Sequence, residues 1–256
     1  MTQEAPPVVA APSDVTPDLG LWLRIVRAVG WTLIWLGMLT LGFVAHQLWI
    51  TSFFAERQQS QLAEQRIENF AETDIVEIPY IPVVGSGEDD GELVSGAVGG
   101  ERLTILSEGK PAEGDPFALI RIPKLEELRE GWNVVEGVTL ADLRTGAGHM
   151  PQTPLPGQPG NAVISGHRTT YGAPFHNLDL LQPGDRIEVE TALGVHVYQV
   201  RESFVVNPTD VWVTEPKSGA WLTLTTCHPK FSARERLIIS AQLIEGPNAA
   251  VILGTQ

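Results

Sequence analysis

Cys227 is the only cysteine among the 256 residues, and its thiol is the strongest nucleophile that the chain offers. It cannot form a disulfide within the chain, and a domain held outside the cytoplasm usually avoids a lone thiol unless the thiol is used. The run WLTLTTC predicts a strand in which Cys227 shares a face with Thr223 and Thr225. Pro229 lacks a backbone N–H and ends that strand. We therefore expect a thiol on the polar face of a strand end; the alternative is a small buried side chain without a chemical role.

An arginine could serve this thiol from the next strand. A hairpin between residues 222–227 and 236–243 would place Arg236 roughly across from Cys227. Its guanidinium would favour the thiolate and could hold the oxygen of a tetrahedral intermediate. Arg234 has the same parity but lies in the loop before the apolar run, so it ranks second. The alternative for either arginine is an exposed residue that forms an ion pair.

His167 is the candidate for the imidazole that activates the thiol. It follows the apolar run 161–165 and Gly166, where the backbone can approach a site closely and a side chain can project from a strand end. The other histidines are His46 in the apolar segment, His196 within an alternating strand and His228 next to the thiol. His149 and His176 lie in Gly- or Pro-rich runs, where we expect solvated loop residues. Adjacent residues of a strand point to opposite faces, so only the backbone N–H of His228 is expected to serve the oxyanion hole.

Metal chemistry and nucleic-acid binding are both disfavoured. The sequence contains no C-x-x-C, H-x-x-x-H or H-E-x-x-H pattern, and the adjacent Cys227 and His228 would be awkward ligands of one tetrahedral ion. We therefore predict no metal and no cofactor. The formal net charge is -14, and residues 56–115 hold 14 acidic and 4 basic residues, which indicates a solvated spacer rather than a basic surface for DNA or RNA.

The elements that must position these residues are mostly strands. Short apolar or alternating runs separated by Gly, Pro, Asn and Asp predict seven strands, in a barrel or a sandwich. They are FALIRIP, WNVVEGV, NAVISG, RIEVET, VHVYQVRESFVV, WLTLTTC and RLIISAQLI. Only LEELRE and VTLADLR resemble helices, and both are too short to be the crossover helices of a parallel α/β fold.

The segment before this domain predicts a membrane anchor. Residues 28–55 carry no formally charged side chain, and a bilayer needs about 20 such residues. The segment is too long for the apolar region of a cleaved signal peptide, so an uncleaved signal anchor fits better than a cleaved signal or a buried core helix. Positive charges on its two sides are balanced and do not fix its orientation. We predict a tail at 1–27, a span at 28–55, an acidic stalk and flexible linker at 56–115, the folded domain at 116–246 and a tail at 247–256.

The C-terminal half closely resembles the sortases, and among them the class E type of high-GC Gram-positive bacteria. The resemblance begins near Ile120 and is carried, in the family's order, by RIPKL, WNVVEGV, GAGHMPQTPLPGQPGNAVISGHRTTYGAPF, LQPGDRIEVET, NPTDVWV and TLTTCHPKFSARERLIISAQL. The T-L-x-T-C core with a downstream arginine is the specific motif. Cys227, His167 and Arg236 match the nucleophile, the histidine and the arginine of the family.

The resemblance implies an all-β domain, an eight-stranded β-barrel with short helices. It implies that Cys227 attacks the Thr carbonyl of an LPXTG-like or LAXTG-like sorting signal in secreted proteins. An amine, usually from a peptidoglycan precursor, would then resolve the thioester, with His167 transferring protons. Because substrate and amine lie outside the cell, the catalytic domain is expected to be extracytoplasmic, on a single-pass anchor in the cell membrane. The carboxylate cluster of the calcium-dependent members is not found in the sequence.

Two other functions fit parts of the same pattern. A cysteine hydrolase on this scaffold would resolve the thioester with water instead of an amine. A membrane-anchored binding or assembly module would keep Cys227 as an inert thiol, so that replacing it with alanine would leave the function intact.

Overall fold

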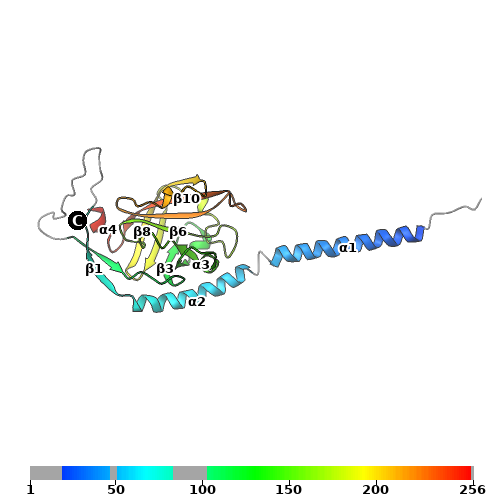
Figure 1. Ribbon diagram of the computed structural model, residues 1–256, viewed down its shortest axis with the longest axis horizontal. Helices are drawn as coiled ribbons and strands as arrows, with labels where there is room; N and C mark the ends of the chain where they lie inside the picture. Colours follow the sequence, from blue (N-terminus) through cyan, green and yellow to red (C-terminus); the bar gives the residue numbers. More distant parts are fainter. Residues whose placement is uncertain (1–18, 47–50, 83–102, 255–256) are drawn as a thin grey trace, which may run out of the picture. The chain divides into compact units, whose positions relative to one another are not determined.

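The computed structural model of the protein describes residues 19–46, 51–82 and 103–254, which fall into two compact units (Figure 1). The first unit contains helix α1 (Leu19–Ala45). Its stretch Gly20–Val44 has a mean hydropathy of 1.5 and is long and apolar enough to cross a membrane. The span was predicted at 28–55 because that run carries no charge. The helix begins earlier and includes Arg24 and Arg27.

The second unit is built on a closed barrel of eight strands, which confirms the predicted all-β fold (Figure 1). The strands follow one another around the barrel in the order β10-β8-β7-β3-β4-β5-β6-β9. The pairs β4–β5 and β6–β9 are parallel, and the others are antiparallel. The strands are β3 (Pro116–Arg121), β4 (Trp132–Glu136), β5 (Ala147–His149), β6 (Gly160–Ser165), β7 (Arg186–Thr191), β8 (Gly194–Val206), β9 (Ala220–His228) and β10 (Glu235–Glu245).

The barrel core is formed by the buried side chains of these strands, some of which alternate with exposed residues while others are buried along nearly their whole length. In β7, Ile187 and Val189 are fully buried, while Arg186, Glu188 and Glu190 are more exposed. In β9, Leu222 and Leu224 are fully buried, as the run WLTLTTC predicted. Burying side chains of this size stabilises the fold by about 1.5–3 kcal/mol each. The core therefore fixes the register of β9, the strand that carries Cys227.

Strand β5 was not predicted because it has only three residues and no alternation. A side chain on Gly148 would lie 2.2 Å from the carbonyl oxygen of Gly137, so only glycine lets this strand approach so closely. The short helices lie in the loops: α3 (Leu140–Thr145), α4 (Ala249–Leu253), and the 3-10 turns η2 (Glu126–Leu128), η3 (Leu178–Leu180) and η4 (Val211–Thr214). The runs LEELRE and VTLADLR account for η2 and α3, as predicted. Thr139 and Asp142 begin α3 with a capping box.

Helix α2 (Thr51–Glu72) packs against the barrel near β3 and β4 (Figure 1). Its Arg66 is buried and donates a hydrogen bond from Nε to Asn133 Oδ1 at 2.8 Å, and Gln59 Oε1 accepts from the Asn133 amide at 2.8 Å. Asn69 donates to the Pro116 carbonyl at 2.9 Å. This helix belongs to the segment expected as a stalk, but Gln59, Arg66 and Asn69 hydrogen-bond to the barrel.

A separate two-stranded antiparallel sheet follows α2. It consists of β1 (Ile75–Pro79) and β2 (Thr104–Glu108). The run at 85–100, which combines Gly, Ser and acidic residues and is expected as the flexible linker, lies outside the described residues. The predicted domain boundaries remain a prediction.

Candidate active site

Cys227 lies near the end of β9, between two partner strands. In the antiparallel ladder with β10 it is paired with Arg236, which confirms the register expected for the hairpin. On the other side, β9 runs parallel to β6, and the last residue of that strand, Ser165, is paired with Thr225. Side chains from the ends of β6 and β9 therefore meet at the same end of the barrel.

His167 reaches that end because β6 stays hydrogen-bonded to β9 up to Gly166. The Gly166 amide donates to the Thr225 carbonyl at 3.1 Å, and the Thr226 hydroxyl donates to the Gly166 carbonyl at 2.7 Å. A side chain at Gly166 would lie 2.6 Å from the ring of Phe175, so glycine is required at this position. The next residue, His167, is thus held beside the strand that carries the thiol.

His167 and Cys227 line one open cavity of about 340 Å³. Cys227 is half-buried, so its thiol is not sealed in the core. The rest of the wall comes from the loop after His167 and the loop after β9. It consists of Arg168, Thr169, Thr170, Phe231, Ser232 and Ala233. The loop residue Phe231 is 81% exposed, so this wall presents an apolar surface to solvent.

Arg236 is not one of the residues that line this cavity, although it pairs with Cys227 across the strands. Its Nη1 donates to the carbonyl oxygens of Ala233 and Glu235, at 3.0 and 2.9 Å. The guanidinium thus braces the loop that forms one side of the cavity. A guanidinium has five N–H donors, so further donors remain for an anion near the thiol.

The surroundings of His167 favour its neutral form. Burial lowers the pKa of His167, and the positive charge of Arg144 lowers it further. The Tyr171 ring lies close to both groups, with its centroid 4.9 Å from the His167 ring centroid and 5.6 Å from the Arg144 guanidinium carbon. His167 Nδ1 is 3.3 Å from the Thr170 hydroxyl, whereas Nε2 has no hydrogen-bond partner among the described residues. Nε2 is buried and is the ring nitrogen left without a partner in the described part of the chain.

Arg168 is the residue of this site to which the sequence assigned no role. It is only 3% exposed, and its guanidinium connects the loop that carries His167 to the strand that carries Cys227. Nη1 donates to the Cys227 carbonyl at 3.3 Å and to His228 Nδ1 at 2.8 Å, and Nη2 lies 2.9 Å from Asp179 Oδ1. Because arginine only donates, the His228 Nδ1 carries no proton. The one available signal was that Arg168 directly follows His167.

The other histidines of the domain have structural partners. His149 is fully buried on β5, where Nδ1 lies 2.6 Å from Glu136 Oε2, so the expectation of a solvated loop histidine was wrong. His196 is buried within β8 opposite Val189, as the alternation predicted, and burial lowers its pKa to about 4. His176 binds the Arg168 carbonyl through Nδ1 at 2.7 Å. Within the described ranges, no group of three or more His, Cys, Asp or Glu side chains could hold a metal ion.

Comparison with known proteins identifies the family. The sortase domain model matches residues 120–244. Sortase SrtE1 of Streptomyces coelicolor is 31% identical over 235 residues, which cover 86% of this chain and 57% of that protein. Sortase SrtE2 of the same organism is 28% identical over 240 residues, which cover 86% of this chain and 83% of that protein. The chain thus spans little more than half the length of SrtE1.

A solved structure agrees with these matches. The SrtF sortase from Corynebacterium diphtheriae is 33% identical, with a TM-score of 0.50, and the match covers 57% of this chain and 92% of that one. The sequence motifs, the eight-stranded barrel and these relatives agree: the chain belongs to the sortase family, in its class E type.

Proposed function

We propose that this protein is a membrane-anchored cysteine transpeptidase. It would cleave an LAXTG- or LPXTG-like sorting signal after its threonine and transfer the acyl group to an amine of the cell wall. The observation that carries this proposal is the cavity at one end of the barrel, which is lined by both Cys227 and His167. Membership of the sortase family supports the same reaction class.

In the first half of the reaction, the thiol of Cys227 gives its proton to His167 Nε2, and the sulfur attacks the carbonyl carbon of the substrate threonine. The carbonyl π electrons move to oxygen and form a tetrahedral oxyanion. When this intermediate collapses, the C–N bond to the following glycine breaks. His167 returns its proton to the departing amine, which leaves an acyl thioester on Cys227.

In the second half, an incoming amine attacks the thioester carbon and forms a new C–N bond. His167 Nε2 accepts the proton that the amine loses. The C–S bond then breaks, and Cys227 regains its proton from His167, so the enzyme ends in its starting state. A neutral His167, which its lowered pKa favours, is the form needed to accept a proton in both halves.

Arg236 would stabilise the oxyanion. It is the cross-strand neighbour of Cys227, and its bonds to the carbonyls of Ala233 and Glu235 hold the guanidinium at the end of the β9–β10 hairpin. A donor fixed before the reaction stabilises developing charge without reorganisation. Arg234 is exposed in the preceding loop and remains the second candidate.

The proposed location is the cell membrane, with helix α1 as a single-pass anchor and the catalytic domain outside the cytoplasm. The length and hydropathy of Gly20–Val44 support the anchor. The proposed partners are secreted proteins that carry a C-terminal sorting signal, and a peptidoglycan precursor or other amine acceptor. Neither a nucleic acid nor a metal takes part in this scheme.

Mass spectrometry of the full chain in detergent tests the proposal. The protein is incubated with LAXTG and LPXTG peptides, with and without glycinamide, beside the Cys227→Ala variant. We expect a glycinamide-exchanged product cleaved after threonine, which the variant does not form. A product that ends in a free threonine carboxylate even at saturating amine would identify a hydrolase. If no peptide forms an adduct with Cys227, the protein is a non-catalytic module.

A further inference from the structure

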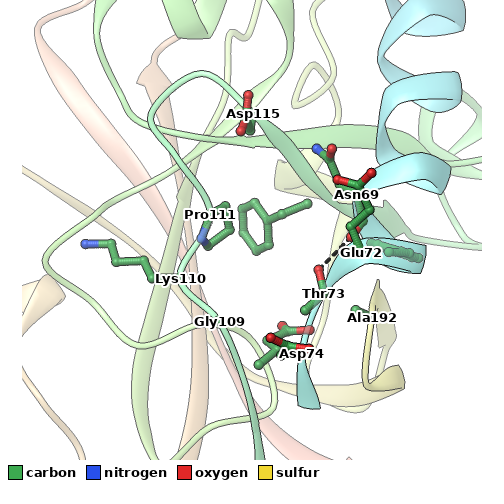
Figure 2. A pocket seen from close by; sticks show the side chains of 12 residues that line it. Asn69, Glu72, Thr73, Asp74, Gly109, Lys110, Pro111, Asp115 and Ala192 are labelled. Atoms are coloured by element: carbon green, nitrogen blue, oxygen red, sulfur yellow. Dashed lines mark hydrogen bonds between the residues drawn. The ribbon is translucent and has the colours of Figure 1, made fainter. Parts of the chain in front are cut away.

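A second cavity, of about 300 Å³, lies away from Cys227 and has no part in the proposed reaction (Figure 2). The end of α2, the segment after β2 and the turn between β7 and β8 form its walls, and Ala192 lies in that turn. Strand β8 starts just after this turn and ends at Val206, which is paired with Arg236, the cross-strand neighbour of Cys227. A strand of this length spans roughly 40 Å, so the two cavities lie at opposite ends of the barrel.

Glu108 is the buried carboxylate of this cavity. It is 9% exposed, and its Oε2 accepts a hydrogen bond from the Leu193 amide, at 3.3 Å. Its Oε1 has no hydrogen-bond partner in the part of the chain that the structure describes. Burial raises the pKa of Glu108 to about 7, against the opposing effect of hydrogen bonds from Thr191 and the neighbouring amides. A buried acceptor without a donor is costly, which indicates a place where a bound donor would stabilise the protein.

The charged residues around Glu108 do not neutralise the negative charge of its carboxylate. Glu72, Asp74 and Asp115 also line the cavity, and Lys110 is the one basic residue among the lining residues. The Lys110 ammonium donates to the Pro151 carbonyl at 2.7 Å and lies 3.7 Å from Glu136, so it is held by groups outside the cavity wall. In Figure 2 its side chain points away from Thr73 and Asp74. The cavity therefore carries an excess of negative charge.

The remaining wall selects the type of cation. The carboxylates here are not grouped to ligate a metal ion, as judged over the described residues. Phe70, Pro111 and Phe117 add apolar surface beside the acidic groups. Aromatic and aliphatic walls with one buried carboxylate suit an organic cation that has an apolar stem. We propose that this cavity binds a primary alkylammonium group, with Glu108 as its counter-ion and hydrogen-bond acceptor.

Calorimetric titration of the full-length Cys227→Ala protein in detergent at pH 8 tests this proposal. The background removes acyl transfer, so the result does not depend on the proposed reaction. Pentylammonium is the probe, and 1-pentanol is its uncharged control. Glu108→Gln removes the charge and keeps the shape, and Ala192→Leu fills the cavity without changing a charge. Glu126→Gln is the matched control. Glu126 is exposed, and in the part of the chain that the structure describes its one ion pair is with Arg129.

We expect the Kd for pentylammonium to rise at least tenfold in Glu108→Gln and in Ala192→Leu, with no change in Glu126→Gln and no binding of 1-pentanol. Equal affinity in all variants, or equal binding of the alcohol, would overturn the proposal. Two further ligands identify the source of the ammonium group. Binding of Nα-acetyl-lysine amide indicates a lysine side chain of a polypeptide, and binding of 1,5-diaminopentane alone indicates a free amine.

Discussion

The Arg168 guanidinium donates a hydrogen bond to the backbone carbonyl of Cys227, at 3.3 Å, although Arg168 is the chain neighbour of His167. One buried side chain thus joins the two segments whose relative position the proposed reaction depends on. It is held in turn by Asp179 and His228. Its geometry suits a residue that positions the nucleophile and the base.

We expect Arg168→Gln to lower kcat by about 100-fold with a smaller effect on KM, because misplacing reactive groups by about 1 Å costs a factor of this size. Arg168→Lys should recover only part of the activity, since one ammonium cannot bind the carbonyl, the imidazole and Asp179 together. Steady-state peptide cleavage measures both effects. If Arg168 had only a structural role, its variants would have a lower Tm, but Cys227 alkylation by iodoacetamide would keep the same pH dependence. That result would contradict the positioning role.

Replacing the proposed base should leave binding intact and remove most of the turnover. General acid–base catalysis contributes about 100- to 10,000-fold, so we expect His167→Gln to lower kcat by at least about 100-fold. His176→Gln is the control, because His176 Nδ1 binds a backbone carbonyl and the residue does not line the cavity. Single-turnover formation of the Cys227 thioester provides the measurement. Similar losses in both variants would argue against a specific role for His167.

Replacing each candidate arginine with glutamine distinguishes which of them stabilises the oxyanion. Losing one oxyanion donor costs about 100- to 1000-fold in kcat, and we expect this loss for Arg236→Gln. Arg234→Gln should remain close to the unaltered protein, because Arg234 lies exposed in the loop before β10. Measuring kcat for both variants under the same conditions decides between the two arginines. The reverse order would assign the oxyanion role to Arg234.

Removing the charge of Arg144 should raise the pKa of His167. Arg144 disfavours the imidazolium form, so in Arg144→Gln the histidine keeps its proton to a higher pH. If neutral His167 accepts the thiol proton, the acidic limb of the kcat/KM profile should move to higher pH. Arg129→Gln is the charge-matched control and should leave that limb in place, because Arg129 is exposed and forms an ion pair with Glu126. An unmoved limb in Arg144→Gln would assign it to another group.

Most of the barrel could be predicted from the sequence, because its strands are apolar or alternating runs of five or more residues. Strand β7 alternates buried and less buried residues, whereas β3 and β6 are almost continuously buried. The three residues of β5 could not be predicted, since they form a strand only through pairing with β4 and β6. The packing of α2 was also missed. Its contacts with the barrel use the polar side chains of Gln59 and Arg66, which in a sequence resemble a solvated helix surface.

The site was predictable where short-range geometry defines it. The hairpin between β9 and β10 fixes the pairing of Cys227 with Arg236, so counting residues was enough. Arg168 was not predictable, because a loop arginine is usually exposed and nothing local indicates burial. Its partner Asp179 follows eleven positions later in another turn, and only the folded chain brings the two together.

Glu108 makes stability depend on pH in a way that Glu108→Gln should abolish. Burial raises the pKa of this carboxyl from its ordinary 4.5 to about 7, so the folded state favours the neutral acid. Below pH 4.5 the group is neutral whether the chain is folded or unfolded, and it opposes folding progressively as the pH rises toward 7. At about 1.4 kcal/mol per pH unit, the full penalty is on the order of 3 kcal/mol above pH 7.

The glutamine variant carries no such penalty, so its advantage in Tm over the unaltered protein should grow from pH 5.5 to about pH 7 and then level off. Thermal unfolding of the full chain in detergent from pH 5.5 to 8.5 measures this trend, with Glu126→Gln as a control that should show none. Since an ammonium ligand would stabilise the ionised carboxylate, pentylammonium should narrow the difference between the two proteins at pH 8. An advantage in Tm that is the same at every pH would mean that Glu108 titrates near its ordinary value. Water or a movement of the β7–β8 turn would then offset the cost of burying its charge.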